Sequence, residues 1–183
     1  MAKIATSDSI LAFWFDEITP QQWFKKDESF DNLLRDRFGE TVTAARSGKL
    51  DLWADNAAGC LALIIVLDQF TRNIYRDTPL AFSGDEMALA LAMRCIERGY
   101  LDTPNSDHRH FMLMPLMHSE ELAIQDMSIP LFEQHTTQMT VDFAIKHRDI
   151  IARFGRFPHR NAILGRPSSD EEIAFLEQPG SSF

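Results

Sequence analysis

Apolar residues recur at helical spacing along almost the whole of this chain, and no stretch alternates apolar and polar residues as a half-buried strand does. The segments between the expected helices are mostly short, which favours antiparallel packing of consecutive helices. We count about nine to eleven expected helices. The sequence therefore predicts an all-α fold made of antiparallel helix pairs.

Several of the expected helices carry signals for their ends. Ser83 with Glu86 and Ser169 with Glu172 have the S-x-x-E spacing of a capping box, in which two side chains satisfy free N–H groups of the first turn. Gly155 follows the apolar stripe of a helix expected near 137–154, and glycine readily adopts the left-handed conformation that ends a helix. These signals predict helix starts near residues 84 and 170 and a helix end near 154.

The longest apolar run, AAGCLALIIVL at Ala57 to Leu67, has eleven residues. A membrane-spanning helix needs about 20, so this run is expected to form a buried core helix. The six-residue apolar run near the N-terminus is shorter than the core of a secretory signal. We therefore expect a cytoplasmic protein that makes no contact with a membrane.

The chain of 183 residues fits a single domain, expected over 1–178, with a flexible C-terminal tail at 179–183. A chain of this size buries about 70% of its unfolded surface, so it needs no metal or disulfide for stability. Cys60 and Cys95 lie in apolar helical runs. We expect both thiols to be reduced and buried in the core.

The formal net charge is -9, which argues against nucleic-acid binding, yet RFGRFPHRNAILGR at 153–166 contains four arginines and no acid. Arginine binds carboxylates and phosphates through two parallel hydrogen bonds. The alternatives are that these arginines offset a helix dipole or neutralise the acidic helices at 119–142. The ligand-binding residues predicted for an anion site are Asp68, Arg72, Asn73, Arg76, Arg148, Arg156, Arg160 and Asn161.

Asp68, Arg72 and Arg76 recur every four residues, directly after the apolar run. If the helix continues, they share one face and Asp68 pairs with Arg72. The charges then begin where a buried helix reaches the surface. They form either an ion pair at a helix end or a polar patch at the mouth of a cleft.

His110, Met114 and His118 have the same four-residue spacing and together resemble a soft metal-ligand set. Pro115 lies among them and is expected to kink the helix that carries them. We therefore predict no bound metal and no cofactor.

An acid–base role is possible for His118, because Glu120 and Glu121 follow it closely. The catalytic candidates are His118, Glu121 and His159. His147 lies on the apolar stripe of its helix, and we expect it to be a hydrogen-bonded core residue.

Three motifs, VLDQFTRNIYRDTPLAF, FMLMPLMHSEELAIQ and HRDIIARFGRFPHRNAILGR, resemble a bacterial family called domain of unknown function 924. The resemblance covers about residues 9–178. It implies a tetratricopeptide-like, right-handed helical array, and it brings no established activity, substrate or catalytic residue. Thr71 stands where the family motif has proline, which is expected to relax the turn there.

Two functions fit these features. The first is a helical-repeat-like binding domain whose arginines hold an anionic small molecule or an acidic peptide. The second is an enzyme that acts on a small anionic substrate, with histidine and glutamate as acid–base groups. A small enclosed cleft with a carboxylate within hydrogen-bond reach of a histidine would favour the enzyme. The oligomeric state stays open.

Overall fold

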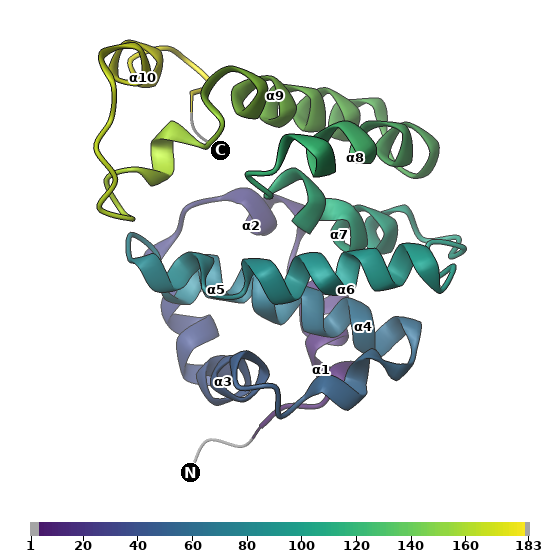
Figure 1. Cartoon of the computed structure of the whole chain (residues 1–183). Coiled ribbons are helices and arrows are strands. Elements are labelled where there is room, and N and C mark those ends of the chain that lie inside the picture. Colours follow the sequence, from purple (N-terminus) through teal and green to yellow (C-terminus); the bar gives the residue numbers. More distant parts are fainter. Residues whose placement is uncertain (1–3, 182–183) are drawn as a thin grey trace.

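The computed structural model describes residues 4–181, and in that part of the chain it contains helices and turns but no strand (Figure 1). Within these residues, joining the α- and π-helical segments that follow one another without a break gives nine helices, apart from short 3-10 turns, so the predicted all-α fold is confirmed. In chain order the α-helical segments are α1 (Ser7–Ala12), α2 (Pro20–Phe24), α3 (Glu28–Arg46), α4 (Ala57–Ile64), α5 (Thr71–Ile74), α6 (Asp85–Glu97), α7 (Ser106–Met117), α8 (Leu122–His135), α9 (Gln138–Phe154) and α10 (Asp170–Leu176).

The apolar run forms the first part of one continuous helix over 57–74, which we call the central helix. It consists of α4, a π-helical turn at Ile65–Phe70, and α5. Its length and apolar composition would allow it to cross a membrane, but 83% of this segment is buried inside the fold. It is therefore a core helix, as predicted. The cytoplasmic location remains a prediction.

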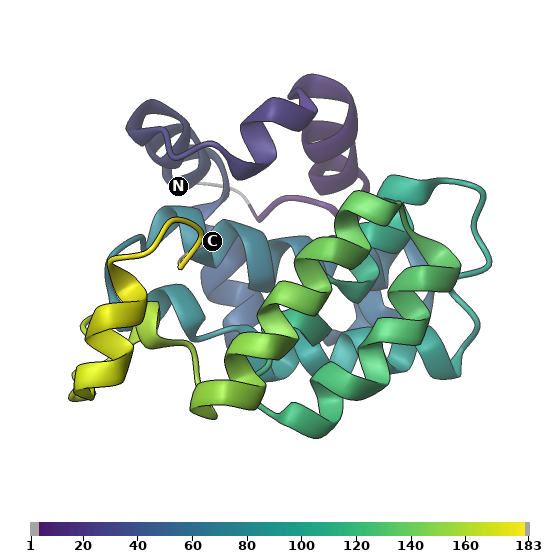
Figure 2. The ribbon, with the colours of Figure 1, turned by 90° about the horizontal axis from the view of Figure 1, so that it is seen from above.

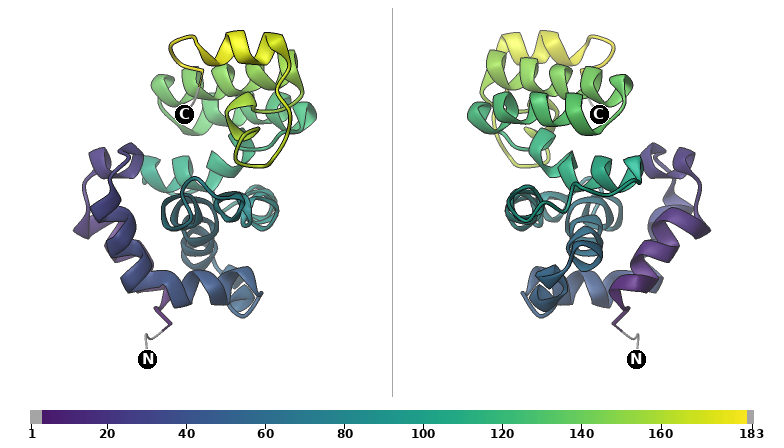
Figure 3. Two further views of the ribbon diagram at one scale, coloured as in Figure 1. Left: turned by 90° about the vertical axis from the view of Figure 1, so that its left-hand side faces the viewer. Right: turned by 90° about the vertical axis from the view of Figure 1, so that its right-hand side faces the viewer.

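The other helices pack around this element and then on one another. α6 packs on α4, α7 on α6, α8 on α7, and α9 on α8. Figure 2 shows α8 and α9 side by side. Figure 3 shows that the N-terminal helices and the pair α8–α9 lie on different sides of the central helix. Consecutive helices are thus neighbours in space, while the tetratricopeptide-like, right-handed arrangement stays a prediction.

The predicted helix ends are confirmed at two places. The Ser169 hydroxyl accepts a hydrogen bond from the Glu172 N–H, and the Glu172 carboxylate accepts one from the Ser169 N–H, which completes the capping box of α10. Gly155 ends α9 in the left-handed conformation, with φ of +68°. The Ser181 hydroxyl donates to the Leu176 carbonyl, and residues 182–183 of the expected tail lie outside the described residues.

The predicted capping box at Ser83 and Glu86 is wrong. The Ser83 hydroxyl instead donates to the Leu80 carbonyl, because Pro79–Phe82 forms a tight 3-10 turn that ends at Ser83. The residue before α6 is Gly84. A Cβ atom at position 84 would lie 2.1 Å from the Leu67 carbonyl oxygen, so only glycine allows the start of α6 to press against the central helix.

Both cysteines are buried, as predicted, with free thiols whose sulfur atoms lie 3.3 Å apart between α4 and α6. Thr71 lies inside the central helix, where its hydroxyl donates to the Leu67 carbonyl at 2.6 Å. The helix therefore continues through position 71 to Ile74 and carries the charged residues that follow the apolar run.

Candidate functional site

A pocket of about 250 Å³ opens where the central helix, the end of α7 and the start of α6 meet. Most of the residues that line it are polar or charged, although it lies against the apolar core. The residues that line it are Asp68, Asp85, Glu86, Leu89, Pro115, His118, Ser119, Glu120, Glu121 and Arg160. Two of the three catalytic candidates and two of the predicted ligand-binding residues are among them.

The Asp68 carboxylate and the His118 imidazole form the innermost polar pair. Asp68 lies in the π-helical turn and is 1% exposed, and its Oδ1 lies 2.7 Å from His118 Nδ1. An ionised carboxylate only accepts hydrogen bonds, so His118 carries its proton on Nδ1 and donates it to Asp68. This bond fixes the ring, and it leaves the His118 Nε2 lone pair as the acceptor.

The charge states of this pair follow from burial and from nearby ions. Burial works to raise the pKa of Asp68, but the positive charge of Arg72 and the contact with His118 outweigh it and hold that pKa below its usual value. Burial lowers the pKa of His118, although Asp68 opposes this effect. The pair at neutral pH is therefore a carboxylate beside a neutral imidazole.

Arg72 links the pair to α6. It contacts Asp68 Oδ1 at 2.8 Å and Asp85 Oδ1 at 3.0 Å, and it donates to the Asp68 carbonyl at 2.7 Å. The predicted Asp68–Arg72 ion pair is confirmed, because the helix continues through both residues. Close packing at Gly84 brings Asp85 within reach of this arginine.

Arg160 reaches the same pocket from the C-terminal segment. Its guanidinium group lies between the rings of Phe82 and Phe157, 4.7 Å and 4.6 Å from their centroids. It donates to the His118 carbonyl at 3.0 Å and to Asp85 Oδ2 at 3.3 Å. Burial lowers the pKa of Arg160 to about 10, so the side chain keeps its charge at neutral pH.

Glu120 lines the pocket and binds the C-terminal segment. Its carboxylate accepts two hydrogen bonds from Arg166, at 2.7 Å and 3.0 Å, and one from the Phe157 N–H at 2.8 Å. Arg166 also donates to the Phe157 carbonyl and to Asn161. Arg166 is absent from the residues predicted for the site. Its place at the end of the arginine-rich stretch is the only sequence signal that could have identified it.

The other predicted arginines lie away from the pocket. Arg76 makes a two-bond pair with Asp31 of α3, at 2.6 Å and 2.8 Å, and also donates to Asn73. Arg156 makes a similar pair with Glu172 of α10, at 2.7 Å and 2.8 Å. These contacts tie helices together and occupy the donors that an anion would need.

Three more predicted residues have structural contacts. Arg148 pairs on the surface with Asp126 and Asp149. Asn161 is buried and donates to the Ser168 hydroxyl. His159 packs against the Phe157 ring at 5.5 Å, and burial lowers its pKa to about 4. The structure thus gathers Asp68, Arg72, His118, Glu121 and Arg160 at one place, and distributes the rest.

His147 is a hydrogen-bonded core residue, as predicted, and its Nδ1 lies 2.8 Å from the Phe143 carbonyl oxygen. The possible metal-ligand set is separated: His110 contacts Thr140, Met114 accepts from Gln69, and His118 contacts Asp68. Within residues 4–181 no group of three or more histidine, cysteine, aspartate or glutamate side chains is arranged to hold a metal.

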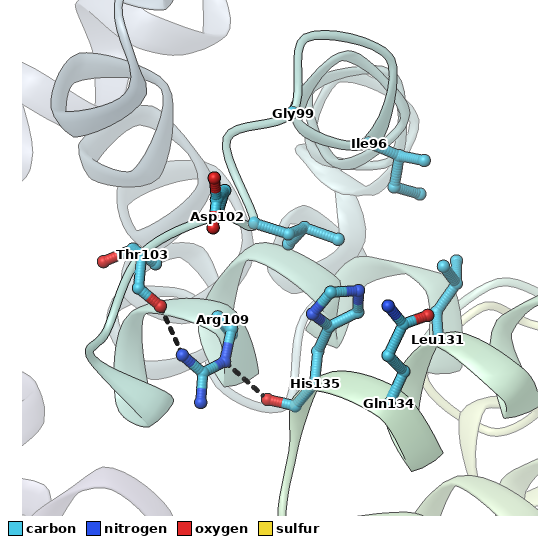
Figure 4. A pocket seen from close by; sticks show the side chains of 9 residues that line it. Ile96, Gly99, Asp102, Thr103, Arg109, Leu131, Gln134 and His135 are labelled. Atoms are coloured by element: carbon cyan, nitrogen blue, oxygen red, sulfur yellow. Dashed lines mark hydrogen bonds between the residues drawn. The ribbon is translucent and has the colours of Figure 1, made fainter.

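A second hollow, of about 520 Å³, lies between the end of α6 and the end of α8 (Figure 4). Arg109 borders it and donates to the carbonyls of Thr103 and His135. These two bonds tie the α6–α7 loop to α8. The smaller pocket is the better candidate for chemistry, because it contains the buried carboxylate–imidazole pair.

Two comparisons with known proteins return matches. A family model described as a bacterial protein of unknown function (DUF924) matches residues 10–180. A solved structure titled as a protein of unknown function, ATU0120 from Agrobacterium tumefaciens, is similar over 94% of this chain and 97% of that chain. The two share 39% sequence identity, and the TM-score is 0.89. The comparison with curated proteins finds no match.

Proposed function

Because this chain belongs to the bacterial family of unknown function DUF924, which carries no activity to transfer, we propose a function from the site itself. We propose that the protein is an enzyme that moves a proton on a small substrate held in the pocket at Asp68 and His118. His118 is the acid–base residue, and Asp68 orients it.

The observation that carries this proposal is the 2.7 Å contact between a buried carboxylate and a histidine that lines a pocket of about 250 Å³. A carboxylate on Nδ1 directs the Nε2 lone pair away from itself, and it stabilises the imidazolium that forms when Nε2 takes a proton. A neutral imidazole at physiological pH is the form that a general base needs. Proton transfer by such a group contributes about 10²–10⁴-fold to a rate.

The size of the pocket limits the substrate. A volume of about 250 Å³ is smaller than the sites that enclose drug-sized ligands, which begin near 300 Å³. A metabolite with few heavy atoms fits it, whereas an extended peptide does not. Leu89 and Pro115 supply apolar wall, and the charged groups opposite them orient polar substituents.

A binding site for an anion is the second candidate, and one observation favours it. Arg72 and Arg160 both contact the carboxylate of Asp85, at 3.0–3.3 Å. Two guanidinium groups that converge on one carboxylate would also hold a ligand carboxylate or phosphate. An anion that binds there has to displace Asp85 or share the arginines with it, and this cost supports the enzyme over the binder.

The test is substrate depletion in a bacterial metabolite extract, followed by mass spectrometry. The wild type should consume at least one small metabolite, and His118→Gln should consume it about 10²–10⁴-fold more slowly. The control is Arg148→Gln, which alters a surface ion pair and should leave the rate unchanged. Equal consumption by the wild type and His118→Gln would contradict the proposal.

A further inference from the structure

The segment Phe157–Arg166, which we call the strap, contacts the proposed base and the second residue after it. Arg160 of the strap donates to the carbonyl of His118 itself. Two residues further along the chain, the Glu120 carboxylate accepts bonds from Arg166 and from the Phe157 N–H. The turn between α7 and α8 is therefore held by the strap at positions 118 and 120.

The His118 carbonyl that Arg160 contacts lies at the C-terminal end of α7. His118 is the C-cap residue that follows Met117 at the end of α7, and the last carbonyls of a helix have no N–H partner inside the helix. Arg160 supplies a charged donor to one of them. The backbone of the histidine and its ring are thus held by separate partners, the ring by Asp68 and the backbone by Arg160.

Arg160 is itself held in one position. It is 7% exposed, and its planar group lies between two aromatic rings, one from the turn before α6 and one from the strap. Its other bond, to Asp85, reaches the carboxylate that Arg72 also contacts. A flat guanidinium group can bridge two acceptors from this space, whereas an ammonium group fills it poorly and provides no second fixed donor.

We propose that Arg160 is a positioning residue for the acid–base chemistry, which fixes the His118 backbone so that its ring keeps the Asp68 contact and directs Nε2 into the pocket. This inference rests on the function proposed above. It gives the arginine-rich stretch a role that differs from anion binding: the strap completes the site by holding the base. Displacement of a reacting group by about 1 Å can cost 10²-fold in rate, so such a contact acts on catalysis without touching substrate.

The competing explanation is that Arg160 only adds stability, as a buried cation paired with an acid. The two explanations differ in what happens at the His118 ring. A merely stabilising contact can be lost with the ring unchanged. A positioning contact cannot, because its loss frees the histidine to rotate, to admit water and to carry its proton on either nitrogen.

The experiment is ¹⁵N-detected imidazole NMR of the folded protein across a pH titration, which reports the tautomer and the pKa of His118. The variants are Arg160→Lys, which keeps the charge, and Arg160→Met, which keeps most of the volume. Arg156→Met is the matched control, because Arg156 lies one residue before the strap and pairs with Glu172 away from the pocket. Circular dichroism confirms that each variant is folded.

We expect the wild type and Arg156→Met to show one His118 tautomer, with the proton on Nδ1. Arg160→Lys and Arg160→Met should both show a mixture of tautomers, and the His118 pKa should rise toward its ordinary value as water enters. The inference is overturned if folded Arg160→Lys keeps the His118 tautomer and the His118 pKa of the wild type. If Arg160→Met does not fold, the result for Arg160→Lys alone decides whether the inference stands. A wild type with its proton on Nε2 would instead contradict the proposed function.

Discussion

Two pairs of arginines in this chain have similar sequence surroundings and opposite structural situations. Arg72 and Arg160 converge on one carboxylate, Asp85, at the edge of a pocket. Arg76 and Arg156 lie away from that pocket. Each makes two hydrogen bonds to a carboxylate that it does not share with another arginine of the four, Asp31 of α3 for Arg76 and Glu172 of α10 for Arg156. The first pair surrounds a place where chemistry is possible, and the second ties helices together.

The comparison teaches that arginine content alone does not identify a ligand site. Each pair has one member in LDQFTRNIYR and one in RFGRFPHRNAILGR, so composition and spacing treat the four residues alike. Their roles separate according to what lies opposite them. Removing one partner at a time therefore tests this distinction.

Among single substitutions, the largest effect is expected on the pocket side, from Asp68→Ala. Arg72 is partly buried, and this change removes its nearest counter-charge. Breaking a buried pair in this way costs about 3–5 kcal/mol of unfolding free energy. Urea denaturation measures the loss. Asp68→Asn, which keeps the shape and one acceptor, should lose less, and equal losses for both variants would contradict a charge-based explanation.

On the other side of the comparison, Arg76→Met should lower the unfolding free energy by about 1.5–3 kcal/mol, because Asp31 is buried and loses two charge-assisted bonds. The imidazole signal of His118 should stay as in the wild type. A change in the tautomer of His118 in this variant would show that Arg76, although it lies away from the pocket, also affects the proposed base.

The third prediction concerns pH. Burial lowers the pKa of His147 to about 3 and that of His159 to about 4, whereas both titrate near 6.5 when the chain is unfolded. The unfolded chain therefore binds more protons below pH 6.5, and stability must fall as the pH drops from there toward 4. Each such histidine contributes a slope of about 1.4 kcal/mol per pH unit.

Denaturation curves at several pH values test this dependence. Replacing His147 with leucine should flatten the profile below pH 6.5, because one of the buried groups that must stay neutral in the folded state is gone. An equally steep profile in His147→Leu would assign the acid sensitivity to other groups.

The smallest effect is expected from Arg148→Gln. Arg148 contacts Asp126 and Asp149 on the surface, where water and salt weaken ion pairs. The melting temperature should stay within about 1 °C of the wild type, which scanning calorimetry resolves. A much lower melting temperature would mean that this exposed arginine contributes more to stability than surface ion pairs normally do.

The fold was predictable because it depends on local signals. The apolar run at Ala57 predicted the buried helix, and Ser169 with Glu172 predicted the start of α10. The box at Ser83 and Glu86 is wrong because the Ser83 hydroxyl donates to the Leu80 carbonyl, and because Gly84, which lies close against the Leu67 carbonyl, is the residue before α6. No spacing rule contains that contact.

The site was predictable only in part, for the same reason. Asp68 with Arg72 is a contact between residues four apart on one helix, and the sequence indicated it. The contact of His118 with Asp68 joins residues 50 positions apart, and that of Arg160 with Asp85 joins residues 75 apart. The sequence alone indicates an anion site in the strap, because it does not show that Asp85 and Glu120 lie opposite the arginines Arg160 and Arg166.

The central claim is that His118 is a neutral base oriented by Asp68, and its tautomer in the wild-type protein tests this most directly. Imidazole NMR of ¹⁵N-histidine-labelled protein at pH 7, with the signal assigned by its absence in His118→Gln, reads which nitrogen carries the proton. We expect a neutral ring protonated on Nδ1, with Nε2 unprotonated. A His118 ring that is protonated on Nε2, or on both nitrogens at pH 7, would contradict the account.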